Sequence, residues 1–490
     1  MILAQNLLRQ LSGNKSLLLF LTGLIFFSSC EIFKPLNKDK DKTPASDTLE
    51  PISGKKVYDP ETGTYVEVKE FPVGDLDTVI WKDFPKIKYP PITSDGAIES
   101  GINPTNVINV NEIGSEKLSS YNVSLILPFL TNEFNASEDA INSNSLWAIN
   151  YYAGSKMAMD VLSEEGVRLN VSVMDSKASA STISSLIRSN PDLKNANLII
   201  GPYRRDNIVQ VAEFAENNEI AFVSPHSAAS GLTKANPEYI QVNPTLETHC
   251  EAIMKHALKH YRPEQIILVS KDVEAERSRL KYFYEEYIFE KGVKDTIMLQ
   301  ELIIKDETAG LEDFQLMPFI NLEDTTVFII PSWSESFIYS LLRKIDVSKS
   351  EYNHIVVYGM PQWMQFEKID YSYYEKLNVH VTASSFINPQ SKDIAAFKQQ
   401  FFDRFGTIPT LEAYLGYDNL IYFGRMLNQY GTKFQYYMDK EKQPTLLTRY
   451  EFEPIIYSDP TTRELSPIQR FENKYVHILK FEDFQFQVTD

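Results

Sequence analysis

The sequence is poor in cysteine and in positive charge, and both shortages exclude classes of protein. Cysteine occurs only at Cys30 and Cys250 among 490 residues. That is too few for the disulfide framework of a small secreted domain, so stability has to come from the size of the core. Lysine and arginine number 48 against 66 aspartates and glutamates, a formal net charge of −18. Nucleic-acid affinity depends on neutralising phosphates, so nucleic acid is excluded as a partner.

The motifs of common catalytic and metal sites are also missing. The sequence has no P-loop, no H-E-x-x-H and no EF-hand pattern. It also lacks the G-x-S-x-G elbow of many hydrolases, and the nearness of Ser224 to His226 does not make a triad, because a triad is defined by geometry. His256 and His260 have the spacing of two zinc ligands, but nothing nearby in the sequence completes a site, and a solvated helix face is expected. The sequence predicts no enzyme, no metal and no cofactor.

No apolar run is long enough to span a membrane. The longest, from Leu17 to Phe27, has about a dozen residues, whereas a spanning helix needs ~20. Arg9 and Lys15 precede it, and small residues follow it up to Cys30. A charged start, a short apolar segment and small residues before a cut are typical of a secretory signal.

The cysteine at the end of this signal indicates its type. Residues 27–30, Phe-Ser-Ser-Cys, resemble the bacterial lipobox, with Phe27 in place of the usual Leu. The resemblance implies that residues 1–29 are removed and that Cys30 becomes an acylated N-terminus that anchors the chain to a membrane. Two alternatives remain open: an ordinary signal peptide with an accidental cysteine, and an uncleaved anchor helix.

Residues 30–120 have the composition of a tether. The first part, KPLNKDKDKTPASDTLEPISG, is polar, charged and contains proline, as expected for a linker. Val57–Tyr58 and Tyr65–Val68 flank the turn-rich DPETG, which predicts a small hairpin. The alternative is that the whole segment is disordered.

From Tyr121 onward, buried strands alternate with helices, and the alternation occurs in two series. The first series of strands is VSLILPF, LNVSVMDSK, ANLIIGPY and EIAFVSPHS, and the second is QIILVSKD, TIMLQELII, TTVFIIPSW and HIVVYGM. Strand–helix alternation predicts parallel sheets with right-handed crossovers. The fold class is therefore α/β, with two doubly wound lobes facing a cleft, because ligands of such sheets bind beyond the carboxyl ends of the strands.

The helix over residues 247–261 begins the second series. Its apolar stripe includes Cys250, which predicts a buried and inert thiol. His249, His256 and His260 lie on one flank of this helix, where a solvated face is expected beside the stripe.

The motifs from Tyr121 to Asp490 resemble the type I periplasmic binding proteins, particularly the leucine/isoleucine/valine-binding branch. The resemblance rests on NLIIGPYRRDNIVQVAEFAENNEIAFVSPHSA, on IAAFKQQFFDRFGTIPTLEAYLGYDNLIYFGRML and on RFENKYVHILKFEDFQ. It implies one lobe over residues 121–245 and about 379–431, and another over 246–378 and about 432–490. It also implies a hinge of several crossings and a ligand held by closure of the lobes.

The chain departs from the family pattern where a ligand is expected. Tyr203, Arg204 and Arg205 follow the GP turn in place of the usual Ser or Thr. The two arginines are candidates to clamp an anionic ligand, or to form a structural ion pair with Asp206 or Glu213. Ser227, after the SP turn, is a candidate carboxylate donor.

Two further features of the expected cleft leave alternatives open. Trp333 and Trp363 follow predicted strands of the second lobe, where they stack on a ligand or pack the lobe. The loop over residues 130–146 is longer than usual, so it covers the site or replaces the ligand.

Two functions remain open. The first is a lipid-anchored solute-binding protein that captures a small polar, amino-acid-like or anionic ligand for a partner such as an ABC permease. The second is a regulator or scaffold with the same fold, such as an activator of a cell-wall enzyme that makes peptidoglycan. Both place the chain in the cell envelope of a Gram-negative bacterium, facing the periplasm or in the outer membrane.

Overall fold

The structure is a computed structural model of the chain. It describes residues 56–59, 64–67, 114–134, 141–292, 297–305, 311, 315–441, 443–457 and 465–489. The lipobox-like residues and most of the predicted tether lie outside this set. In the region of the predicted hairpin, β1 (Lys56–Asp59) and β2 (Thr64–Glu67) form a two-stranded sheet. Within the described residues, no helix has both the length and the apolar character needed to cross a membrane.

The first large sheet has seven strands, in the order β15-β16-β7-β6-β5-β3-β4. Its strands are β3 (Tyr121–Leu127), β4 (Leu169–Asp175), β5 (Leu198–Ile200), β6 (Ala221–Ser224), β7 (Tyr239–Gln241), β15 (Phe452–Ile455) and β16 (Arg470–Asn473). The pairings from β4 to β16 are parallel, and β15 is antiparallel to β16.

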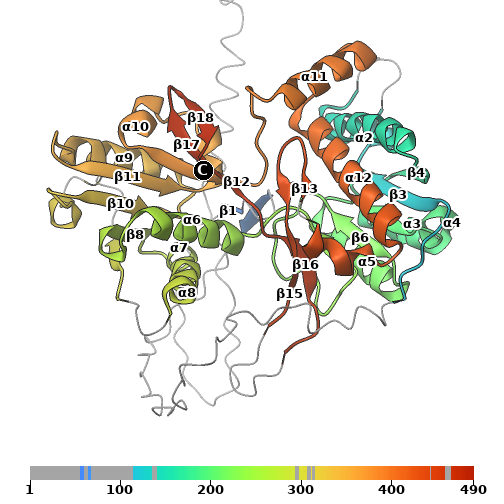
Figure 1. The fold of residues 1–490 in the computed structure, drawn as a ribbon, viewed down its shortest axis with the longest axis horizontal. Helices are drawn as coiled ribbons and strands as arrows, with labels where there is room; N and C mark the ends of the chain where they lie inside the picture. The colour runs from blue at the N-terminus through green and yellow to red at the C-terminus, as the bar shows by residue number, and fades with distance from the viewer. Residues whose placement is uncertain are drawn as a thin grey trace, which may run out of the picture. The chain divides into compact units, whose positions relative to one another are not determined.

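Helices cover both faces of this first sheet. They are α2 (Leu146–Glu164), α3 (Ala180–Ser189), α4 (Pro191–Lys194), α5 (Arg205–Asn217) and α12 (Leu411–Tyr430). A further helix, α11 (Lys392–Phe405), packs on α2 and α12. In β3, Leu125 and Leu127 pack with residues of α2 and α12, which lie side by side in Figure 1, while Ile126 packs with residues of α3 and α5. A strand buried on both faces needs apolar residues on both of them, and Leu125, Ile126 and Leu127 supply these in β3.

The second large sheet also has seven strands, in the order β18-β17-β12-β11-β10-β8-β9. Its strands are β8 (Ile266–Lys271), β9 (Gln300–Ile304), β10 (Thr325–Ile329), β11 (His354–Gly359), β12 (Val379–Ala383), β17 (His477–Glu482) and β18 (Gln485–Val488). The helices of this lobe are α6 (Leu246–His260), α7 (Glu274–Arg277), α8 (Leu280–Lys291), α9 (Glu335–Ser348) and α10 (Tyr371–Lys376). The strands from β9 to β12 are parallel, and β17 and β18 are added antiparallel.

Smaller elements connect the larger ones. Short 3₁₀ turns are η3 (Thr131–Glu133), η4 (Ser143–Ser145), η5 (Pro263–Gln265), η6 (Met317–Phe319), η7 (Pro361–Gln365) and η8 (Phe434–Lys440). A two-residue pairing joins β13 (Gln443–Pro444) to β14 (Arg449–Tyr450). The two mixed, mostly parallel sheets confirm the predicted α/β class.

The predicted lobe boundaries are wrong in two places. The segment from residue 379 was expected in the first lobe, but β12 pairs with β11 and β17 of the second sheet. Residues 432–490 were expected in the second lobe, but β15 and β16 complete the first sheet. The chain thus changes sheet between β16 and β17, within the motif RFENKYVHILKFEDFQ, which the family resemblance placed wholly in the second lobe.

Candidate functional site

Aromatic side chains meet beyond the carboxyl ends of β5 and β6. Tyr203 follows β5, His226 follows β6, and Trp147 lies in the first turn of α2. The Trp147 ring centroid lies 5.5 Å from that of Tyr203 and 4.8 Å from that of His226. On the helix side, Trp147 stacks on Tyr151 at 5.5 Å. We call Trp147, Tyr203 and His226 the aromatic edge.

A hydrogen bond fixes the protonation of His226. The Trp147 Nε1 donates to His226 Nε2 at 3.0 Å. An indole N–H only donates, so Nε2 must carry a lone pair and the ring proton lies on Nδ1. The ring keeps solvent contact, yet the surrounding protein desolvates it and lowers the pKa of His226, with the Glu412 carboxylate opposing that shift. The neutral imidazole therefore has its Nδ1–H available as a donor.

The charge of one carboxylate reaches this edge. Glu412, in the first turn of α12, is half-buried, and its charge acts on His226. Its Oε2 accepts a hydrogen bond from Thr410 Oγ1 at 2.5 Å, which restrains the side chain. Sequence reasoning missed both Trp147 and Glu412, because they lie at the starts of helices far from the GP and SP turns.

The residues predicted after those turns have different environments. Tyr203 belongs to the aromatic edge, and Arg204 and Arg205 are exposed at the start of α5. Among the described residues, neither arginine forms an ion pair with Asp206 or any other carboxylate, so the alternative of a structural ion pair finds no support here. The Ser227 Oγ accepts a hydrogen bond from the Ala229 N at 3.2 Å, which shapes its own turn.

The loop after β3 is held by a carboxylate at the end of β4. Asp175 accepts hydrogen bonds from the backbone N–H groups of Leu130, Thr131 and Lys177 at 3.2, 2.8 and 2.8 Å. Desolvation opposes ionisation, but these hydrogen bonds outweigh it and lower the pKa of Asp175. This carboxylate is occupied by its own loop, so it does not count among the ligand-binding candidates.

A second polar group lies beyond the carboxyl ends of β8 and β10. Glu276 accepts a hydrogen bond from Ser332 Oγ at 2.9 Å and pairs with Lys271 at 3.6 Å. The guanidinium of Arg279 lies 3.4 Å from the Trp333 ring centroid, a cation–π contact. This predicted candidate, Trp333, is half-buried and lies at the carboxyl edge of its sheet.

Trp363 has the environment of a core residue. Its side chain has 0% exposure, its Nε1 donates to Ser332 O at 2.9 Å, and its ring stacks near Phe366 and Tyr374. A Cβ added at Gly359 would lie 2.3 Å from this ring. Packing, one of the two alternatives for Trp363, is therefore what the structure has.

The expectation of a solvated histidine face on α6 is wrong for two of its three members. His249 is 7% exposed. His256 is half-buried, with Nδ1 2.7 Å from Tyr358 OH. Only His260 is exposed. No group of three or more His, Cys, Asp or Glu residues suited to a metal ion occurs within the described residues.

Cys250, on the apolar stripe of α6, has 0% exposure, as expected for a buried thiol. Burial also raises its pKa, which keeps the thiol protonated and unreactive.

The burial of His380 predicts that the stability of the fold depends on pH. His380 is 6% exposed, and desolvation, with Lys480 nearby, lowers its pKa to about 4. A buried histidine with a lowered pKa stabilises the fold above its unfolded pKa of about 6.5, and that stability is lost as the pH falls towards 4. We expect His380→Asn to reduce the slope of unfolding free energy between pH 4 and 6.5 by up to about 1.4 kcal/mol per pH unit.

Urea unfolding at several pH values measures this slope. His354→Asn, at an exposed position of the same sheet, is the matched control and should leave the slope unchanged. Equal slopes for His380→Asn and the parent protein would contradict the prediction.

Comparison with known families gives one match over more than half of the chain. The family model described as "Receptor family ligand binding region" matches residues 155–454. No curated protein matches the sequence.

Many solved structures have a similar fold. A putative branched-chain amino acid ABC transporter from Rhodospirillum rubrum has 13% sequence identity and a TM-score of 0.56, and the match covers 76% of this chain and 100% of that one. A substrate-binding protein from Desulfitobacterium hafniense in complex with Leu has 15% identity and a TM-score of 0.47, covering 75% and 99%. A solute binding protein from Rhodopseudomonas palustris BisB5 in complex with 3,4-dihydroxy benzoic acid has 15% identity and a TM-score of 0.42, covering 75% and 95%. At such identities, the likeness to the Rhodospirillum rubrum structure bears on the fold alone.

Proposed function

The chain belongs to the family described as "Receptor family ligand binding region" and has the type I periplasmic-binding fold. From this premise we propose that the protein captures a small polar solute for transport. The proposed ligand is amino-acid-like, with an ammonium group. The proposed site is the aromatic edge together with Glu412, on the first lobe. The Trp333–Arg279 group of the second lobe is the proposed partner surface on closure.

The convergence of the aromatic edge and Glu412 is the observation that supports this proposal. Three elements far apart in sequence bring Trp147, Tyr203 and His226 into ring contact, and a half-buried carboxylate acts on that edge. A carboxylate next to aromatic rings suits a cationic group, through a charge-assisted hydrogen bond and ring–cation contact. The His226 Nδ1–H and the exposed Arg204 and Arg205 are the donors on offer to the anionic end of a zwitterion.

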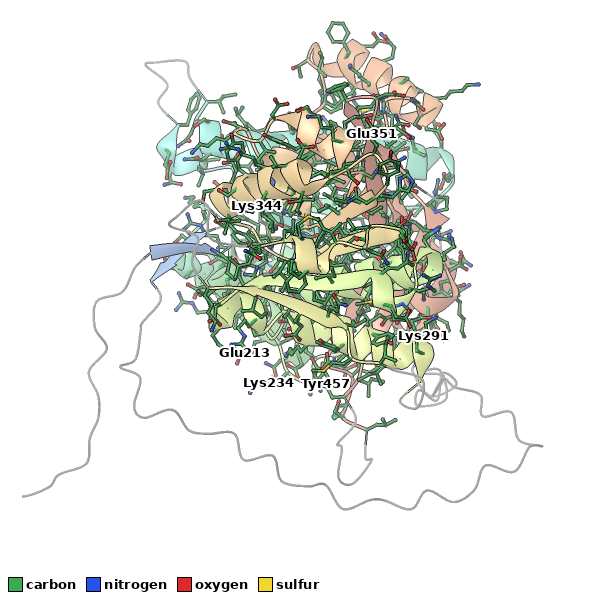
Figure 2. All side chains as sticks on the ribbon, turned by 90° about the vertical axis from the view of Figure 1, so that its left-hand side faces the viewer. Glu213, Lys234, Lys291, Lys344, Glu351 and Tyr457 are labelled. Atoms are coloured by element: carbon green, nitrogen blue, oxygen red, sulfur yellow. The ribbon has the colours of Figure 1, made fainter. Side chains whose placement is uncertain are left out.

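Substitution of the carboxylate tests this assignment. We expect Glu412→Gln to weaken binding of an amine-bearing ligand by about 10- to 100-fold, because a charge-assisted hydrogen bond contributes about 1.5–3 kcal/mol. Glu213→Gln, on the exposed side of α5 in the same lobe (Figure 2), is the control and should leave the affinity unchanged. Calorimetric titration measures both, and equal affinities for Glu412→Gln and the parent protein would refute the role.

The ligand can be identified without assuming its chemical class. Mass spectrometry of the denatured protein identifies co-purified small molecules, and a thermal-shift panel of amino acids and short anions follows. A ligand at 100 times its Kd adds about 2.7 kcal/mol of stability, a shift that is readily measured. Arg205→Ala then separates an anion clamp from an uninvolved arginine, because only a clamp loses affinity for the anionic members of the panel.

One observation favours a second function, that of an envelope regulator or scaffold. The indole of Trp147 already contacts the Tyr203 ring and donates a hydrogen bond to His226. The protein's own side chains therefore occupy part of the surface that a ligand would contact. A flat thermal-shift panel, together with recovery of a cell-wall enzyme on the immobilised protein, supports the scaffold. A ligand-induced shift that Glu412→Gln abolishes supports the receptor.

Anchoring at Cys30 is a separate part of the proposal. We expect the full-length chain to incorporate radioactive palmitate in a Gram-negative host, and Cys30→Ser to abolish the label because the thiol is the acylation site. Cys250→Ser, at the buried cysteine, should retain the label. A parent protein that stays unlabelled would refute the lipid anchor and leave the solute-binding proposal intact.

A further inference from the structure

A row of buried polar side chains crosses the first sheet where the chain leaves it for α6. Ser224, Gln241 and Glu472 are in register on the neighbouring strands β6, β7 and β16. Partners in register on parallel strands point to the same face of the sheet. Their exposures are 0%, 0% and 1%, so the row has no contact with bulk solvent.

The carboxylate of this row has all its partners within the protein. Glu472 Oε1 accepts from Thr245 N at 3.1 Å, from Thr245 Oγ1 at 2.7 Å and from Thr248 Oγ1 at 2.8 Å. Its Oε2 accepts two hydrogen bonds from Arg470, with Nε at 3.0 Å. With five hydrogen bonds, Glu472 has no lone pair to spare for its other neighbours.

Those neighbours include four polar atoms without a partner. They are Ser224 Oγ, Tyr239 OH, Gln241 Oε1 and His249 Nδ1, and none has a partner of good hydrogen-bond geometry among the described residues. Ser224 Oγ and Tyr239 OH nevertheless lie near enough for a weak mutual hydrogen bond, which lowers the pKa of Tyr239 against the larger effect of burial. Each belongs to a side chain that is at most 7% exposed. Leaving a buried polar atom unsatisfied costs about 1–3 kcal/mol, and folded proteins seldom leave several such atoms together.

The charge of Glu472 acts on two of these side chains, Tyr239 and His249. Tyr239 lies two residues before Gln241, on the same face of β7, and its environment includes the Ser224 hydroxyl, Arg470 and Glu472. Burial there raises the pKa of Tyr239 to about 12, so the phenol stays protonated and able to donate.

We propose that this cluster is a binding site for internal water, at the junction of β6, β7, β16 and α6. Water both donates and accepts, so it satisfies the mixture of hydroxyl, amide oxygen and imidazole nitrogen that neither an anion nor a cation would satisfy. Buried waters typically make about three hydrogen bonds to such groups. The site joins the strand end that precedes His226 to the helix that begins the second lobe, and the crossing at Thr245 borders it.

The sign of a stability change tests the site. If water satisfies the phenol, Tyr239→Phe removes a hydrogen bond, and we expect the Tm to fall by about 2–4 °C. If the phenol has no partner, the same change removes a desolvation penalty and the Tm rises. Tyr352→Phe, at a side chain that is 83% exposed, is the matched control and should leave the Tm unchanged. A Tm for Tyr239→Phe that rises or stays constant overturns the proposal.

A crystal structure separates water from a direct Ser224–Tyr239 hydrogen bond, which would also lower the Tm on substitution. We expect density for water within hydrogen-bond distance of at least two of the four atoms in the parent protein. That density should weaken or move in Tyr239→Phe. An unhydrated cluster in which Ser224 and Tyr239 bond only to each other overturns the proposal, whatever ligand the protein binds.

Discussion

Replacing Gly154 with alanine is expected to destabilise the first lobe by about 3 kcal/mol or more. Gly154 lies in α2, where alanine normally stabilises a helix by about 0.5–1 kcal/mol over glycine. Here a Cβ would lie 1.7 Å from the carbonyl oxygen of Ala413 on α12. Gly416 of α12 makes the reciprocal approach, with a Cβ position 2.0 Å from Tyr151 O. Both obstacles are backbone atoms, so the helices would have to move apart.

Urea unfolding followed by circular dichroism measures the loss. Gly424→Ala is the matched control in the same helix pair, because its Cβ would meet the end of the flexible Leu162 side chain, with Cδ1 at 2.6 Å. We expect this control to cost less than about 1.5 kcal/mol, since Leu162 can change rotamer. A Gly154→Ala protein as stable as the parent would mean that α2 and α12 do not approach as closely as this structure has them.

The sequence revealed the class of fold because burial on two faces leaves a local trace. β3 contains the apolar run Leu125–Leu127 and β6 the run Ala221–Val223, and helical spacing between them indicated the crossovers. The late change of sheet left no such trace. β16 and β17 are separated only by residues 474–476, and a strand pattern does not record which sheet a strand joins.

The candidate site was only partly visible in the sequence for a similar reason. Tyr203 was identified because it follows the GP turn, which the resemblance to a family marked. Trp147 and Glu412 act on His226 from the starts of α2 and α12. The two residues are 265 positions apart in the sequence, so only the packing of the two helices brings them to the same edge. Trp363 was ambiguous because a tryptophan after a strand looks the same whether it faces a ligand or the core.

The same reasoning explains the misjudged histidines. His249 and His256 flank an apolar stripe, and helical spacing alone placed them towards solvent. In the structure, Tyr358 of β11 lies 2.7 Å from His256, and the charge of Glu472 of β16 acts on the buried His249. Burial of a helix flank depends on these tertiary partners, which periodicity does not encode.

Neutralising Glu472 is expected to cost about 3–5 kcal/mol, the other large effect that the structure predicts. Glu472→Gln keeps the volume but leaves Arg470, which is 5% exposed, without its carboxylate. The amide nitrogen also donates where the carboxylate accepted, so it opposes either the Arg470 or the threonine donors. Glu453→Gln is the control, because Glu453 is the exposed register partner of Glu472 on β15.

The pH dependence of this loss has a definite sign. Desolvation raises the pKa of Glu472, but Arg470, Lys474 and the hydrogen bonds from Thr245 outweigh it, and the net shift is downward. A carboxyl with a lowered pKa stabilises the fold above its unfolded pKa of about 4.3, and this contribution is lost as the pH falls through the folded value. The difference in unfolding free energy between the parent protein and Glu472→Gln should therefore be largest near neutral pH and become smaller in acid.

A double substitution distinguishes two possible sources of this cost: the unpaired charge of Arg470, and the loss of the interactions that Glu472 made. If most of the cost comes from stranding the Arg470 guanidinium, Arg470→Met combined with Glu472→Met should recover much of the stability, because apolar residues of similar volume often replace a buried pair without loss. The threonine donors at the start of α6 would still lack an acceptor, so recovery should be incomplete. A double variant no more stable than Glu472→Gln would assign the cost to the cap of α6, and hence to the crossing between the two lobes.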